Sequence, residues 1–156
     1  GGLKNQSRFG GFIFDTVQPS DNLTLAETFN MNAALISRGA IHKIGFLDKA
    51  FAHHRADIDF GLRLIRAGGK VLVIPGIHGI CTLNSYRSFN YYNEKNFYRR
   101  FKRLIHPKNE PFFERFIFFW RHSSFFGFIF FFTPYLTFFF PFLRDTLPRS
   151  RIFLKE

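Results

Sequence analysis

The segment ADIDFGLRLIRAGGKVLVIP, residues 56–75, constrains the fold of this chain more than any other. Its first part has apolar side chains at the spacing of one helix face, and Gly68-Gly69 is a typical stop for such a helix. The face is formed by Ile58, Leu62 and Ile65. The run KVLVIP that follows predicts a compact, buried strand closed by Pro75. A helix that leads directly into a buried strand is typical of α/β folds.

Residues 29–37, FNMNAALIS, predict an apolar strand that ends at Ser37. Serine is a favoured N-cap, so we expect Ser37 to begin a short helix, RGAIHKI, that stops at Gly45. Together with the segment above, this gives the order strand, helix, helix, strand within residues 29–75. That order predicts an α/β domain.

Charge and aromatic residues are concentrated in the second half of the chain. Of the net charge of +11, residues 1–86 carry +3 and residues 87–156 carry +8, and the second part also holds 19 of the 26 Phe. We therefore expect an α/β part at 1–86 and a basic, aromatic, helical tail at 87–156. Such a tail favours an anionic partner, either phospholipid or nucleic acid.

Within the tail, residues 125–143 are nineteen consecutive uncharged residues, FFGFIFFFTPYLTFFFPFL. At about 1.5 Å per residue, a helix of this length would just cross a hydrocarbon core. Pro134 and Pro141 interrupt the run. Three arrangements are open: a hydrophobic hairpin or interfacial helices, a single span, or burial within the protein. The basic, aromatic stretch that precedes the run favours an anionic lipid surface.

Cys81 is the only cysteine, which excludes a disulfide framework and fits a reducing compartment. We expect it to be a small buried residue. The chain begins Gly-Gly-Leu with no initiator Met, which indicates a fragment of a longer protein. No Cys/His cluster has zinc spacing, and no Gly-rich phosphate loop follows a predicted strand.

Two aspartates, Asp57 and Asp59, stand where the helix of residues 57–69 should begin. Aspartate is favoured at helix N-termini, where a carboxylate gains about 0.3–1 kcal/mol from the helix dipole. Asp59 and Arg63 have the spacing of a helical ion pair. From spacing alone, capping and pairing are the favoured interpretation, and catalysis is the alternative.

The order of motifs resembles the C-terminal half of the catalytic domain of bacterial family 2 glycosyltransferases. The resemblance is close over about 55 residues and looser over about 80. The matching residues are Asn30-Met31-Asn32, Gly45-Phe46-Leu47-Asp48, Phe51, Asp57-Ile58-Asp59-Phe60-Gly61-Leu62-Arg63, Pro75, Gly79 and Cys81. The departures from the pattern are Met31 for Gly, Ala56 for Gly or Glu, and Phe60 for Tyr. Because Ala56 replaces a second carboxylate found in many relatives, Asp57 is the only candidate at the base position.

The resemblance implies an α/β fold: the C-terminal, acceptor-side part of a nucleotide-diphospho-sugar transferase (GT-A type) domain, followed by an α-helical, Phe-rich, membrane-associated tail. It assigns Asp57 as the general base of an inverting glycosyl transfer. Asn30 and Asn32 would face the donor sugar or the acceptor. Asp59, Arg63 and His54 are further candidates for substrate contact, with Asp59 and Arg63 equally open to a structural role.

The resemblance also implies a nucleotide-sugar donor, a glycan or lipid-linked acceptor, and Mg²⁺ or Mn²⁺ held mostly by residues of an N-terminal half outside this sequence. We therefore expect residues 1–156 alone to bind no nucleotide sugar tightly and to transfer none. The complete enzyme would act in surface polysaccharide assembly at the cytoplasmic face of the bacterial inner membrane, peripherally or through a hydrophobic anchor. The alternatives are a non-catalytic membrane-associated remnant and, less favoured, a basic nucleic-acid-binding module.

Overall fold

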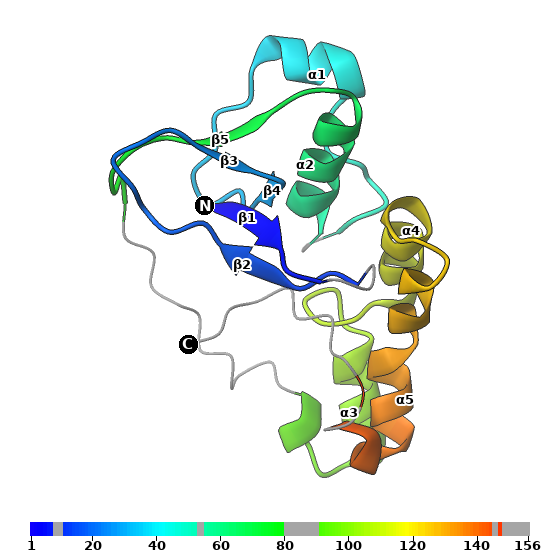
Figure 1. Cartoon of the computed structure of the whole chain (residues 1–156). Coiled ribbons are helices and arrows are strands. Elements are labelled where there is room, and N and C mark those ends of the chain that lie inside the picture. The colour runs from blue at the N-terminus through cyan, green and yellow to red at the C-terminus, as the bar shows by residue number, and fades with distance from the viewer. Residues whose placement is uncertain (8–10, 53–54, 80–90, 145–146, 148–156) are drawn as a thin grey trace. The chain divides into compact units, whose positions relative to one another are not determined.

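A computed structural model describes residues 1–7, 11–52, 55–79, 91–144 and 147. Within this part, residues 1–7 and 12–79 belong to one compact unit, and residues 91–144 belong to a second (Figure 1). The first unit combines short strands with two helices, whereas the second is built from helices. The described part of the chain is therefore a mixed α/β protein.

The first unit contains two small antiparallel sheets. One has the strand order β2-β1-β4, and in the other β3 pairs with β5. The strands are β1 (Gly2–Asn5), β2 (Phe14–Thr16), β3 (Thr24–Ala26), β4 (Thr28–Phe29) and β5 (Val71–Val73). These sheets place the end of β4 and the start of the segment after it beside the N-terminus, where the Asn30 N–H donates to the Gly1 carbonyl at 2.9 Å.

The predicted strand over residues 29–37 is wrong for most of its length. Strand β4 ends at Phe29, and the chain then turns and runs without regular structure to Ser37. The reason is visible at Met31, whose N–H donates to the Asp57 side chain instead of to a neighbouring strand. The apolar side chains of this segment do not alternate as in a strand: Met31 and Ile36 pack against the core, whereas Leu35 is fully exposed.

The predicted strand KVLVIP is confirmed over Val71–Val73, but it is not buried throughout. Val71 belongs to the core of the first unit, whereas Leu72 and Ile74 are exposed. This alternation follows from the period of two in a strand that packs only one of its faces. The strand therefore contributes one buried core residue, Val71, and the half-buried Val73 packs beside it.

The first helix, α1 (Arg38–Ile44), has the predicted boundaries. The Ser37 hydroxyl oxygen accepts the Ala40 N–H at 3.1 Å, which is the N-cap bond expected of serine. The helix stops at Gly45, whose φ of 76° suits glycine.

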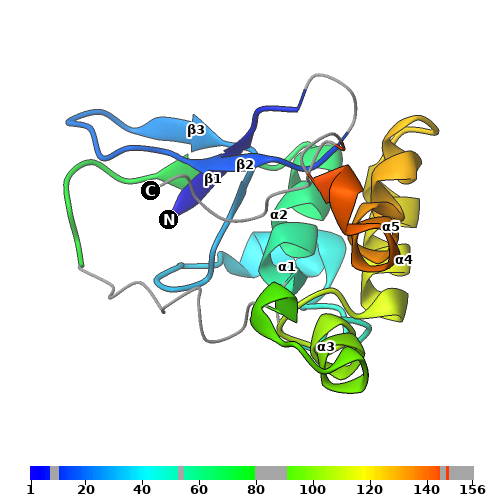
Figure 2. The same ribbon diagram turned by 90° about the horizontal axis from the view of Figure 1, so that it is seen from below.

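The second helix, α2 (Ala56–Arg66), is also confirmed, and Gly68, at φ 75°, follows its end. Its core face is wider than predicted. Ile58 is buried as expected, but Leu62 and Ile65 are only half-buried, and Phe60 and Leu64 supply the main core contacts. Figure 2 shows α1 and α2 side by side, and the two helices are in contact.

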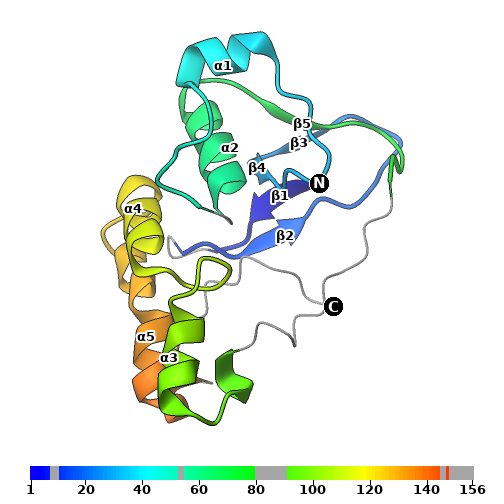
Figure 3. The ribbon, with the colours of Figure 1, turned by 180° about the vertical axis from the view of Figure 1, so that it is seen from behind.

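Helix α2 packs directly on β4, as Figure 3 shows. The Thr28 hydroxyl donates to the Ile58 carbonyl at 2.9 Å, and the rings of Phe29 and Phe60 meet edge to face at 6.2 Å. A Cβ on Gly61 would lie 2.8 Å from the Thr28 Cα, so no other residue fits there without moving the strand. This contact fixes the position of α2.

The second unit contains α3 (Phe97–Leu104), α4 (Phe112–His122) and α5 (Thr133–Phe139), with the 3₁₀ turns η2 (Tyr91–Asn93), η3 (Gly127–Phe131) and η4 (Pro141–Arg144). Arg115 is its buried polar centre. The guanidinium donates to the Glu110 carboxylate at 2.6 Å and to the Phe131 carbonyl at 2.8 Å, and it lies over the Phe119 ring. These contacts join α4 to η3.

The uncharged run of residues 125–143 does not form the single helix that a membrane span requires. It forms η3, α5 and η4, with breaks at Phe132 and Phe140. Pro134 and Pro141 each lie in the first residues of a helical segment, where the missing N–H is tolerated. None of the helices in the described part of the chain is both long enough and apolar enough to cross a bilayer.

We predict that Gly61→Ala lowers the free energy of unfolding by about 1–3 kcal/mol, because the added methyl group must displace Thr28. Gly39→Ala, in α1, is the matched control. Its Cβ would meet only the Ser37 hydroxyl at 4.0 Å, so alanine should leave stability unchanged or raise it by up to about 1 kcal/mol. Urea unfolding of both variants measures the difference. Equal stability of the two would contradict the close contact between α2 and β4.

Candidate active site

Asp57 lies in the first turn of α2, but it is not the N-cap. The N-cap position is held by Arg55, whose side chain makes no capping hydrogen bond. Asp57 nevertheless satisfies one of the free N–H groups of the first turn, because its Oδ1 accepts the Ile58 N–H at 2.9 Å. The capping interpretation is thus correct in its chemistry and wrong in its position.

The second oxygen of Asp57 reaches a different segment. Oδ2 accepts the Met31 N–H at 3.1 Å, which joins α2 to the turn after β4. With one N–H on each oxygen, the carboxylate is held in one direction, and each oxygen keeps a lone pair for a further donor. The side chain is half-buried, so a ligand can reach it. This is an arrangement in which a carboxylate could accept a proton from a hydroxyl.

Asp59 and Arg63 form the ion pair that their spacing predicts. Asp59 is fully buried, and its Oδ2 lies 2.7 Å from the Arg63 Nε. The two terminal nitrogens of Arg63 donate to the Ile44 carbonyl at 2.7 Å and to the Phe46 carbonyl at 3.0 Å. The guanidinium therefore ties α2 to the end of α1. A contact of either residue with a substrate stays a prediction.

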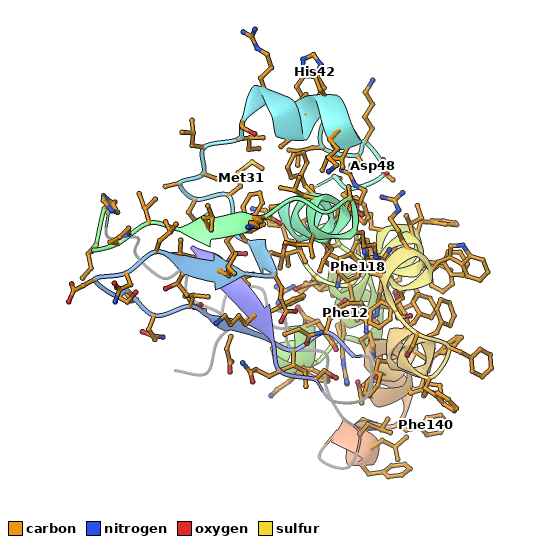
Figure 4. The ribbon with its side chains drawn as sticks, turned by 45° about the horizontal axis from the view of Figure 1, so that its top comes forward. Phe12, Met31, His42, Asp48, Phe118 and Phe140 are labelled. Carbon is orange, nitrogen blue, oxygen red and sulfur yellow. The ribbon has the colours of Figure 1, made fainter. Side chains whose placement is uncertain are left out.

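Asn30 and Asn32 flank Met31, so the bond from the Met31 N–H to Asp57 brings the backbone of both residues close to the carboxylate. Asn30 is half-buried and Asn32 is exposed. Figure 4 labels Met31, whose side chain packs against the apolar cluster of the first unit. His54 and Cys81 lie outside the described residues.

No pattern in the sequence indicates the role of Arg55. It is fully buried, and its φ of 123° is unusual for any residue other than glycine. Its carbonyl accepts the Asp59 N–H at 2.7 Å and so starts the hydrogen bonding of α2. Backbone strain of this kind is found at functional sites more often than elsewhere. Here it lies two residues before Asp57.

A family model described as glycosyl transferase family group 2 matches residues 8–153, nearly the whole chain. The chain belongs to this family. No curated protein and no solved structure matches it. Membership in this family indicates that the general activity is glycosyl transfer. The family implies a nucleotide-sugar donor and an acceptor as substrates.

Members of this glycosyltransferase family commonly use a divalent metal ion. In the part of the chain that the structure describes, no three His, Cys, Asp or Glu side chains come together in a way that could hold one. Asp57 and Asp59, the acidic pair in α2, do not share a site, because Asp59 is buried against Arg63. The acidic pair of α2 is therefore no candidate metal site.

A shallow depression of about 530 Å³ lies on the first unit beside α1. It is lined by Arg38, Ile41, His42 and Phe46. None of the candidate site residues of this glycosyltransferase lines it, although the carbonyl of Phe46 is held by Arg63. We place the candidate site at Asp57, where the family motif and the hydrogen bonds coincide, and not at this depression.

We predict that Arg63→Met lowers the free energy of unfolding by about 3–5 kcal/mol, because it removes the cation that pairs with the buried Asp59 carboxylate. Arg66→Met, on the same helix at an exposed position, should change stability by less than about 0.5 kcal/mol. Chemical denaturation of the two variants provides the comparison. If both substitutions had the same small effect, the pair would not hold α2 in place.

Proposed function

We propose that this protein is an inverting glycosyltransferase in which Asp57 is the catalytic base. It moves a sugar from a nucleotide-sugar donor to a hydroxyl group of a glycan or glycolipid acceptor. The observation that supports this proposal is the half-buried Asp57 carboxylate, fixed by the N–H groups of Met31 and Ile58 within the motif that resembles the family's base position.

In the proposed step, the acceptor oxygen attacks the anomeric carbon from the face opposite the nucleotide. The new carbon–oxygen bond forms as the bond to the diphosphate breaks, so the configuration at that carbon inverts. The acceptor's proton passes to Asp57. A base fixed within hydrogen-bond reach of the hydroxyl typically contributes about 10²–10⁴-fold to the rate.

Neighbouring residues would support this step in different ways. The side-chain amides of Asn30 and Asn32 both donate and accept hydrogen bonds, which suits hydroxyl-rich ligands. Asp59 and Arg63 would act by holding α2, since their charges are paired with each other. His54 remains a candidate for substrate contact. A divalent ion would neutralise the diphosphate of the donor, and we expect most of its ligands to lie outside this sequence.

We further propose that the enzyme works in surface polysaccharide assembly at the cytoplasmic face of a bacterial inner membrane. The support for this location is the strongly basic, Phe-rich second part of the sequence. If the acceptor is linked to a lipid in this membrane, an enzyme bound to the membrane surface meets the reacting hydroxyl there and not in the bulk solvent.

We predict that Asp57→Asn, made in the protein encoded by the complete reading frame, lowers the turnover of glycosyl transfer by at least about 10²-fold. The variant should still fold, because the amide oxygen accepts one of the two N–H groups that the carboxylate binds. Donor binding should also persist, since it does not require proton transfer. Turnover of a radiolabelled donor and donor titration measure the two effects separately.

Asp21→Asn is the matched control for this experiment. Asp21 is exposed in the same unit and lies outside the residues that match the family motif, so this substitution makes the same chemical change away from the candidate site. It should leave turnover within about threefold of the wild type. If Asp57→Asn retained a tenth or more of the wild-type turnover, Asp57 would be ruled out as the base.

A further inference from the structure

The second unit has many aromatic side chains, some buried in its core and others exposed on its surface. Its core is filled by rings that are almost completely buried, among them Phe118, Phe119 and Phe131. On the surface, Phe113 is 77% exposed and Trp120 is 75% exposed. Large exposed apolar patches on a folded protein mark sites of interaction.

Several exposed rings and the half-buried ring of Phe128 lie along α4 and the residues after it. The rings of Phe116 and Trp120 are stacked, with their centroids 6.1 Å apart. The Phe128 ring contacts both of these rings and also the ring of Phe132. Phe113 precedes Phe116 by one helical turn. We call this the aromatic face: Phe113, Phe116, Trp120, Phe128 and Phe132. In Figure 4, aromatic rings extend from α4, drawn in yellow, and from the segment that follows it.

The turn after α4 adds to the apolar surface. Phe125 and Phe126 are both exposed, and their rings meet at 5.8 Å. No charged residue lies between Ser123 and Leu143. The side chains of the aromatic face are therefore suited to a partner that offers an apolar layer rather than a set of hydrogen-bonding groups.

The exposed charges of the second unit have a single sign in the described residues. Its three carboxylates are withdrawn from the surface: Glu94 and Glu110 are half-buried and pair with Arg103 and Arg115, and Glu114 is buried. The exposed cations are Lys95, Arg99, Lys102, Arg103 and Lys108. This distribution favours a partner whose surface is anionic.

An anionic lipid surface matches both properties. Its headgroups attract the cations, and the layer beneath them accepts aromatic rings, as interfacial helices require. A single-stranded nucleic acid is a poorer match, because base stacking needs ring faces that stand free, whereas the rings of the aromatic face contact one another.

We propose that the aromatic face is a membrane-binding surface, which adsorbs to anionic lipid through its rings while the cations of the second unit contact the headgroups. The proposal refines the membrane location given under the proposed function and rests on it, but it does not depend on Asp57. Vesicle binding needs no sugar donor. A failure of binding and a failure of glycosyl transfer are therefore separate results.

The chain carries its own probe, since Trp120 is its only tryptophan and lies within the aromatic face. We expect the full chain to bind vesicles of phosphatidylglycerol and phosphatidylcholine in equal parts, with a shift of the Trp120 emission to shorter wavelength. Phe113→Ser should weaken this binding about tenfold. Arg99→Gln should weaken it about fivefold at low salt, with a smaller effect at high salt.

The matched controls lie in the first unit. Phe46 is 75% exposed, so Phe46→Ser removes an equally exposed ring, and Lys70→Gln removes an equally exposed cation. Neither should change vesicle binding by more than about twofold. The proposal is overturned if the chain does not bind anionic vesicles, if it binds pure phosphatidylcholine equally well, or if Phe46→Ser weakens binding as much as Phe113→Ser. Self-association that already shifts the Trp120 emission without lipid would instead assign the aromatic face to contact between copies of the chain.

Discussion

Helix α2 and strand β4 approach so closely that position 61 has no space for a side chain, and the candidate active site depends on this contact. With glycine there, the Thr28 hydroxyl reaches the Ile58 carbonyl, one residue from Asp57. The same approach brings the turn after β4 to the N-terminal end of α2, where the Met31 N–H binds Asp57. A strand displaced by one side chain would separate the two segments that hold the carboxylate.

Each unit also relies on a guanidinium that ties a helix to neighbouring backbone. Arg63 binds Asp59 and two carbonyls, and Arg115 binds Glu110 and the carbonyls of Phe130 and Phe131. The guanidinium of arginine suits this role, because it is planar and permanently charged and its five N–H groups can donate to several buried acceptors at once. In the first unit this leaves Asp57, rather than Asp59, as the carboxylate that a ligand can approach.

The structural features that could be predicted correctly from the sequence depend on residues close together in the chain. The Ser37 cap, the end of α1 at Gly45 and the Asp59–Arg63 pair each depend on residues within one or two helical turns. The strand proposed for residues 29–37 failed because Met31 binds Asp57, 26 residues away, and no short pattern records such a contact. The strands before residue 27 are three or four residues long, too short for a periodic signal. The helix pattern placed Asp57 at the start of α2, and the family resemblance gave its expected role as base, but the hydrogen bonds that hold its carboxylate are visible only in the structure.

As the proposed base, Asp57 removes a proton from the acceptor and does not merely hold the site in shape. The most direct test compares an acceptor bearing a hydroxyl with the same acceptor bearing a thiol at the reacting position, in the wild type and in Asp57→Asn of the complete enzyme. A thiol ionises near pH ~8.5 without help, so a base is no longer needed as the pH rises through that value. If Asp57 is the base, the large deficit in turnover that the variant shows with the hydroxyl acceptor should shrink to within a few fold with the thiol acceptor at about pH 9. A variant equally impaired with both acceptors would contradict the assignment and leave Asp57 with a structural role.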